Sequence, residues 1–227
     1  MTKKSSLTIG SDLTGSSDGA GQENQETGKT RRALLAAALA LFADRGIYEP
    51  TIEEITEKAD VGKGTFYQHF LSREALIAEL TRNGFALLLE EAEKEAADAR
   101  DGDGRLRAIF KSHGAFFAQH PEYLLLFHQA RGWMKVERHH YGALREVFSD
   151  YVFRIADLMG DKPSAPGGPP SPRAVAVAGF IAGVLSFEFI LASEVPKRGL
   201  EELLALLVGS EADSSGTRPG TAAWRRA

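Results

Sequence analysis

The 227-residue sequence contains no cysteine, so disulfide bonds and cysteine-ligated zinc sites are excluded, which fits a reducing cytoplasm. No segment reads as a β-strand, and no glycine-rich phosphate loop follows one. The adjacent His139 and His140 point to different faces of a helix, which is poor geometry for a metal chelate. These absences argue against an enzyme and against a bound metal or cofactor.

An excess of positive charge is also lacking, because the formal net charge is −4 at pH 7. Any attraction to a polyanion must therefore come from local clusters of basic residues. Residues 1–28 and 210–227 are polar and carry no apolar periodicity, so we expect a disordered tail at each end. The N-terminal tail has no apolar run of the length that a signal peptide needs.

The sequence does contain a helix-turn-helix pattern, in residues 51–70. Thr51 and Glu54 form the T-x-x-E capping box that begins a helix. The apolar face of this helix carries Ile52, Ile55 and Ala59. The helix ends at the corner 60–62, where Gly62 is expected to supply a tight backbone turn.

The second helix of the pattern spans residues 63–70. Phe66 and Phe70 lie one turn apart and face inward. The outer face and its flanks then carry Lys63, Gly64, Thr65, Tyr67, Gln68 and His69. A helix with these residues suits the major groove, since Gly64 permits close approach, Gln68 can read adenine and the others can contact phosphates. A plain two-helix corner with a solvated face fits the periodicity equally well.

Four linked sequence words decide between these alternatives: A-x-x-L-F-A-D-R-G at 38–46, T-I-E-E-I-T-E-K-A-D-V at 51–61, G-K-G-T-F-Y-Q-H-F at 62–70 and S-R-E-A-L at 72–76. Through them, residues 30–80 resemble the DNA-binding domain of the TetR family of bacterial transcriptional regulators. The resemblance implies an all-α protein with an N-terminal three-helix DNA-binding domain and a larger C-terminal helical domain for effector binding and dimerisation. We expect the two domains at 29–75 and 76–209.

The resemblance also implies which residues contact double-stranded DNA. They are Lys29, Arg31, Thr51, Lys63, Gly64, Thr65, Tyr67, Gln68, His69 and Arg73. Two positions depart from the family pattern: Gly62 stands where Ser or Thr often caps the recognition helix, and Glu53 stands where a basic residue is often found. Because residues 29–73 hold seven basic and six acidic side chains, we expect few phosphate contacts per monomer and binding as a dimer.

The rest of the chain reads as further helices. We expect helices at 29–45 with Gly46 as the stop, from the N-cap Ser72 into the charged run 90–101, from 105, at 122–134, at 141–159, at 174–192 and at 200–208, with a loop at 160–172. The run 174–192 is long enough to span a membrane, but Glu188 and many Ala and Gly residues argue against it. Its small residues permit close helix packing, and the resemblance implies that the last two helices, about residues 173–208, form a homodimer interface, with no membrane contact.

Aromatic residues are dense in the C-terminal half and suit a cavity for a small hydrophobic or aromatic effector. The residues expected to line it are Phe110, His113, Phe117, Phe127, His128, Trp133, Tyr151, Phe187 and Glu188. Core packing is the alternative for each aromatic residue. His113 is as readily a core histidine as a ligand contact. We expect Glu188 to pair with a cationic ligand or with a basic residue across the dimer.

The resemblance implies a cytoplasmic repressor. Two recognition helices would enter successive major grooves of a pseudo-palindromic operator, about 34 to 36 Å apart, and the resemblance implies that an effector changes the angle of the fourth helix and releases the DNA. Two other functions remain open from the sequence: a DNA-binding regulator without a ligand, and a helical interaction module that has lost DNA binding.

Overall fold

A computed structural model describes residues 18–136, 142–161 and 167–190, with side chains placed at 25–134, 142–161 and 167–184. Within these ranges all regular structure is helical, which confirms the predicted fold class. The helices are α1 (Asp18–Arg45), α2 (Ile52–Lys58), α3 (Lys63–His69), α4 (Arg73–Ala96), α5 (Gly102–Gln119), α6 (Pro121–Val136), α7 (Gly142–Met159) and α8 (Pro172–Ile190). The expected helix at 200–208 and the C-terminal tail lie outside the described residues.

The helix boundaries around α2 follow the predicted capping chemistry. Gly46 has a φ of +74°, the left-handed conformation that ends α1. Thr51 caps α2: its hydroxyl oxygen accepts from the backbone N–H of Glu54, and its own N–H donates to the Glu54 carboxylate. That N–H, together with the Arg45 guanidinium, lowers the pKa of Glu54 to about 2. The capping box is therefore ionised at any physiological pH.

The corner between α2 and α3 differs from its prediction in one residue. Gly62 has a φ of −73°, which any residue adopts, so the turn makes no use of its glycine freedom. The left-handed residue is instead Asp60, with a φ of 56°. Aspartate tolerates this conformation better than most residues because its short polar side chain can bond locally. Gly62 caps α3 without any side-chain hydrogen bond, as the missing hydroxyl implies.

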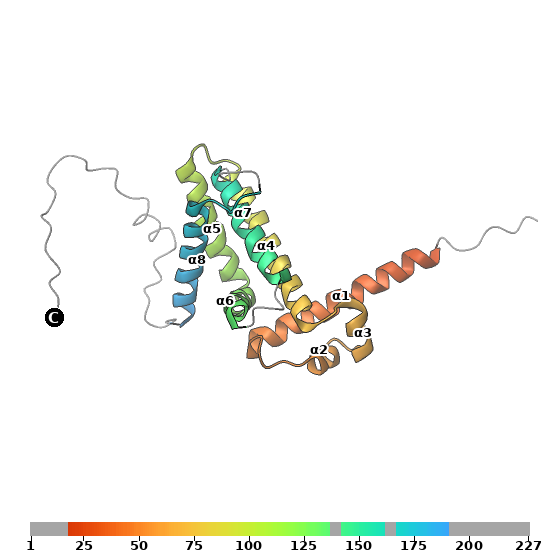
Figure 1. Cartoon of the computed structure of the whole chain (residues 1–227). Helices are drawn as coiled ribbons and strands as arrows, with labels where there is room; N and C mark the ends of the chain where they lie inside the picture. Colours follow the sequence, from red (N-terminus) through yellow and green to blue (C-terminus); the bar gives the residue numbers. More distant parts are fainter. Residues whose placement is uncertain (1–17, 137–141, 162–166, 191–227) are drawn as a thin grey trace, which may run out of the picture.

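Helix α1 begins at Asp18 rather than at the expected Lys29, so it includes residues that were expected in the N-terminal tail. Figure 1 shows this first part of α1 projecting away from the other helices. Residues 25–27 are exposed, so the extension has no buried face there. Apolar periodicity cannot reveal a helix that buries nothing, which explains the missed start.

Helix α4 connects two groups of helices (Figure 1): α1, α2 and α3 lie at one end, and α5, α6 and α7 pack along the rest of it, with α8 resting on α7 and α6. Ser72 caps α4 as predicted, accepting from the N–H of Ala75. At Gly84, α4 comes so close to α6 that an added Cβ would lie 2.4 Å from Cδ1 of Tyr123. The ring of Phe85 stacks on Tyr151 of α7 at 4.3 Å and lies 4.2 Å from Phe127 of α6. Aromatic contacts thus join α4, α6 and α7 at one point.

Helix α8 is the apolar run that the sequence flagged for its length. Among the described helices, none is both long and apolar enough to cross a bilayer. The helix packs on α7 and α6 through Ala174, Ala178 and Ile181, which are buried. Val175 stays half exposed, and a Cβ at Gly179 or Gly183 would meet nothing within 4 Å.

Candidate functional site

Buried aromatic residues on the inner face of α3 fix the position of its outer face. Phe66 is fully buried and Phe70 nearly so, with ring centroids 5.6 Å apart. On the other side, Tyr67 is 50% exposed, Gln68 is exposed, and a Cβ at Gly64 would meet open space. The outer face of α3 is polar, carries no side chain at Gly64, and lies on a helix whose inner face is buried. Such a face can approach a duplex closely.

Lys63, the first residue of α3, already has a partner in the protein. Its Nζ forms an ion pair with Glu53 of α2, and both side chains remain more than half exposed. The hydrogen bond from Lys63 lowers the pKa of the Glu53 carboxyl, and the same bond raises the pKa of Lys63. Glu53 is the acidic residue that departs from the family pattern, and any contact from Lys63 to a phosphate must compete with this carboxylate.

Arg31 serves the fold rather than presenting a free cation. Its Nε donates to Glu79 of α4 at 2.8 Å, and its Nη2 pairs with the other oxygen of that carboxylate. Nη1 donates to the backbone oxygen of His69 at 2.9 Å, and the guanidinium lies over the Phe70 ring at 4.6 Å. A bidentate, stacked guanidinium of this kind ties α1 to α3 and α4. These bonds give Arg31 a structural role beside the DNA contact expected of it, which stays a prediction.

Some of the remaining residues expected at DNA are exposed, and others are partly buried or already in contact with other side chains. Lys29 and Thr51 are exposed, the Thr51 hydroxyl being engaged with Glu54. Thr65 and His69 are partly buried on the flanks of α3. The guanidinium of Arg73 lies 5.7 Å from the ring centre of Trp133, at the contact between α4 and α6.

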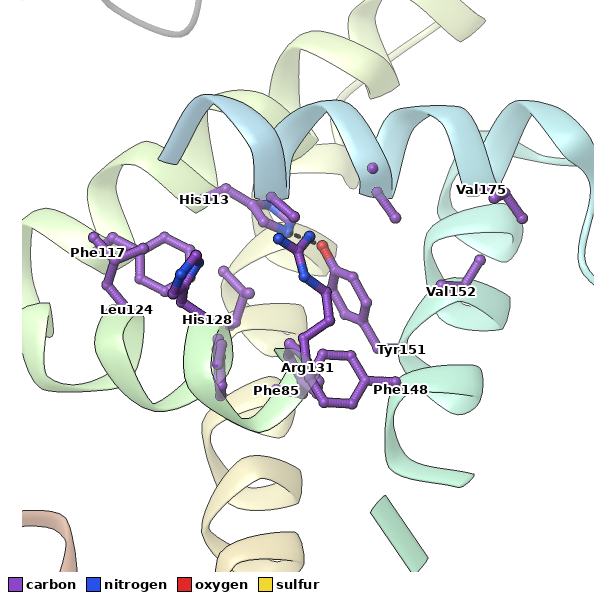
Figure 2. Close-up of a pocket in the computed structure, with 15 residues that line it drawn as sticks. Phe85, His113, Phe117, Leu124, His128, Arg131, Phe148, Tyr151, Val152 and Val175 are labelled. Atoms are coloured by element: carbon purple, nitrogen blue, oxygen red, sulfur yellow. Dashed lines mark hydrogen bonds between the residues drawn. The ribbon is translucent and has the colours of Figure 1, made fainter. Parts of the chain in front are cut away.

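A second feature is a partly enclosed cavity of about 260 Å³ between α4, α5, α6, α7 and α8. Five expected residues line it: His113, Phe117, Phe127, His128 and Tyr151. Ten others were not foreseen: Phe85, Leu88, Leu124, Arg131, Phe148, Val152, Val175, Ala178, Gly179 and Ala182. Figure 2 shows the labelled side chains converging from these helices. On α6 the lining residues recur with helical spacing at 124, 127, 128 and 131, a signal that the sequence carried.

Two of the other expected ligand residues lie outside the cavity. Phe110 packs against Phe180 in the core, with ring centroids 5.6 Å apart, and does not line the cavity. Trp133 lies at the edge of the DNA-binding end, where it also meets Tyr48 at 6.1 Å. Phe187 and Glu188 fall in the last turns of α8, where side chains are outside the described residues.

His113 and Tyr151 form a buried neutral pair at the wall of the cavity. The Nδ1 of His113 lies 2.6 Å from the carbonyl oxygen of Ile109, which only accepts, so Nδ1 carries the proton. Nε2 must then accept from the Tyr151 hydroxyl at 2.8 Å, the contact drawn in Figure 2. Burial lowers the pKa of His113 to about 4 and raises that of Tyr151. The pair therefore brings no charge to the cavity at neutral pH.

Helix α6 carries both the cavity and the contact with the DNA-binding end. The Oε1 of Gln129 accepts from the backbone N–H of Ile47 at 2.6 Å. The Gln129 side chain fills the space beside Gly46, where a Cβ would lie 2.7 Å from its Nε2. Trp133, one turn on, contacts Tyr48 and Arg73. Residues 129 and 133 thus hold the end of α1, while 128 and 131 line the cavity.

The helix-turn-helix of the structure lies in the segment that is similar to known proteins in sequence. Residues 34–80 match the profile of the family described as "Bacterial regulatory proteins, tetR family". The HTH-type transcriptional repressor KstR2 of Mycobacterium tuberculosis is 30% identical over 109 residues, which are 48% of this chain and 52% of KstR2. The chain thus spans about half the length of the curated relative that it matches.

Solved structures extend the likeness beyond this segment. A TetR-family transcriptional regulator from Rhodococcus sp. has a TM-score of 0.65 at 20% identity, over 80% of this chain and 97% of that one. FadR from Bacillus subtilis, solved in complex with stearoyl-CoA, has a TM-score of 0.61 at 15% identity, over 78% and 97%. At these identities the likeness establishes a common fold.

Proposed function

The chain belongs to the TetR family of bacterial regulatory proteins, and we propose that it is a ligand-responsive repressor that binds a pseudo-palindromic operator as a dimer. The family consists of transcription regulators rather than enzymes. The observation that carries the proposal is the outer face of α3, where Gly64, Tyr67 and Gln68 are exposed on a helix anchored by the buried Phe66.

In the proposed complex α3 lies in the major groove. Gly64 lets the helix approach the base edges, Gln68 supplies the amide that can read adenine, and the Tyr67 hydroxyl donates to a phosphate. Lys63 exchanges its Glu53 partner for the DNA backbone. A contact from Arg31 to the DNA would compete with its bonds to Glu79 and His69.

A dimer would place two copies of α3 on one face of the duplex. The outward side of α8 supports an interface there, since Ala176 is exposed and a Cβ added at Gly183 would meet nothing within 4 Å, which permits a close helix approach. The interface proposed for residues 173–208 includes the chain beyond Ile190, outside the described part.

The cavity supports an effector over the alternative of a purely structural aromatic core. Because α6 lines the cavity on one side and holds Ile47 on the other, an effector that shifts α6 would move the end of α1 and with it α2 and α3. The effector must bind the shifted state better than the DNA-bound one, and DNA must weaken effector binding by the same factor. This places the transmission step in α6 as well as in α4.

The test is fluorescence anisotropy of the full chain on labelled DNA from upstream of its own gene, with excess unrelated DNA, at two salt concentrations. Specific binding should survive the competitor. The variants Lys63→Ala and Tyr67→Ala should each weaken binding of the dimer about tenfold, because each removes one modest contact from both subunits.

Lys94→Ala is the matched control for Lys63→Ala. Lys94 is also an exposed lysine paired with one glutamate, Glu90, but it lies on α4 away from α3. Its replacement should leave DNA affinity unchanged. Equal binding by the wild type and both α3 variants on every DNA tried would refute the proposal and favour a helical module without DNA recognition.

A further inference from the structure

Among the residues that the structure describes, Arg131 is the one charged side chain that lines the cavity, and the chemistry around it indicates a class of ligand. Eleven of the fifteen lining residues are apolar or glycine, and the four polar ones are His113, His128, Arg131 and Tyr151. No carboxylate lines the cavity among the residues that the structure describes. An arginine stays protonated at any physiological pH, so this wall of the cavity is cationic.

The other polar groups supply no counter-charge. His113 and Tyr151 satisfy each other as a neutral pair, with the tyrosine proton used in the hydrogen bond to Nε2. The Tyr151 oxygen therefore has only acceptor capacity left, which suits a donor and not an anion. Figure 2 shows the Arg131 side chain extending from α6 among the labelled lining residues.

Arg131 makes no hydrogen bond or ion pair with the described residues, although it is partly buried. A guanidinium that loses water beside apolar walls costs free energy until an anion pairs with it. A carboxylate matches its fork with two parallel bonds and neutralises its single charge. A phosphate dianion would leave a second negative charge uncompensated in the same apolar space.

We propose that the ligand of this cavity is a compact apolar carboxylic acid whose carboxylate pairs with Arg131 and whose body packs among the aromatic rings. The volume of about 260 Å³ lies just below the usual range of about 300 to 1,000 Å³ for small-molecule pockets, so the ligand is small. Phe85, Phe117, Phe127 and Phe148 provide flat walls for an aromatic or short aliphatic body. The inference rests on the proposed function only in taking this cavity to be the effector site.

The test measures ligand binding directly, by isothermal titration calorimetry on the full chain without DNA. The probes are 3-phenylpropanoate, the isosteric alcohol 3-phenylpropanol and 3-phenylpropyl phosphate. The wild type should bind the carboxylate at least about tenfold more tightly than the alcohol, the factor expected for a charge-assisted pair. It should also bind the carboxylate more tightly than the phosphate.

Arg131→Gln should remove the preference for the acid and leave the affinity for the alcohol within about twofold. That unchanged alcohol affinity shows that the variant is folded and that its cavity is intact. The matched control is Arg107→Gln on α5, an exposed arginine that does not line the cavity, and it should keep the wild-type preference.

Three outcomes would overturn the inference: an acid preference that persists in Arg131→Gln, an alcohol bound as tightly as the acid by the wild type, or no binding of either. Tighter binding of the phosphate would show that the anion is not a carboxylate. These results are separate from the operator experiment, because DNA binding can hold when acid recognition fails, and the reverse.

Discussion

The DNA-binding end and the cavity use their basic residues in opposite ways. On α1 to α3, Arg31, Arg45 and Lys63 each pair with a carboxylate of the protein: Glu79, Glu54 and Glu53. In the cavity, Arg131 faces apolar walls and pairs with no carboxylate among the described residues. Three cations of the DNA-binding end are thus paired with carboxylates of the protein before any ligand arrives, and the cation of the cavity is not.

The difference bears on how each region binds. A phosphate that approaches α3 must displace a carboxylate from Lys63, so each contact gains little and affinity has to come from several contacts and from two subunits. An anion entering the cavity displaces no protein partner from Arg131. Recognition there is concentrated in one contact, while recognition of DNA is spread over a surface.

The largest expected effect comes from testing whether the two regions fold independently. Phe66→Ala removes a fully buried ring beneath α3 and should lower the free energy of unfolding of the DNA-binding end by about 3 to 5 kcal/mol. Hydrogen exchange monitored by mass spectrometry should show protection lost across residues 52–70 and kept in α5.

The neighbouring aromatic residue provides the control for this variant. Tyr67 is 50% exposed, so Tyr67→Ala should change the free energy of unfolding by less than about 0.5 kcal/mol. Loss of protection in α5 as well as α3 for Phe66→Ala would mean that the regions unfold as one unit, and the contrast drawn between them would not extend to stability.

A smaller effect should follow from the neutral pair in the cavity wall. The unfolded chain gains a proton on His113 near its ordinary pKa of about 6.5, whereas the folded chain gains it only near 4. Between these values the unfolded state binds more protons, so stability falls as pH falls. From pH 7 to pH 5 the loss should be roughly 2 kcal/mol, measured by urea unfolding at each pH.

His113→Gln removes the titrating group and should flatten this part of the pH profile. The matched variant His120→Gln, which changes a histidine at the half-exposed end of α5, should retain the slope. If His113→Gln loses stability with acid as the wild type does, other groups govern the profile, and the pair is not held neutral in the way its hydrogen bonds indicate.

The helix-turn-helix was predictable because its determinants are close together in the sequence. The capping box uses Thr51 and Glu54, three residues apart, and the inner face of α3 uses Phe66 and Phe70, four apart. Interactions between residues this close in the sequence can be recognised without knowledge of the fold. The long-range contacts could not be predicted there: Arg31 bonds to Glu79, 48 positions away, and no local pattern indicates this pairing.

The cavity was only partly predictable for the same reason. Aromatic density located it, and five of the expected residues line it. Whether Phe110 or Phe85 faces the cavity depends on how α4, α5 and α7 pack, which no spacing along one helix reveals. Arg131 follows His128 by three positions on α6 and so lies on the same face of the helix. It was not predicted, because the cavity was inferred mainly from aromatic residues.

The smallest expected effect tests the pairing of cations at the DNA-binding end. Glu53→Gln removes the carboxylate that holds Lys63 and should raise DNA affinity roughly two- to fivefold, as expected for an exposed pair. Glu90→Gln, which breaks the similar exposed pair with Lys94 on α4, should not alter affinity. Anisotropy titrations of both variants on one operator fragment at constant salt measure the difference.

A gain in DNA affinity specific to Glu53→Gln means that the protein restrains its own recognition helix through this carboxylate. An unchanged or weaker affinity means that Glu53 instead holds Lys63 in the position that DNA requires, and that the paired cations of this region are oriented rather than neutralised.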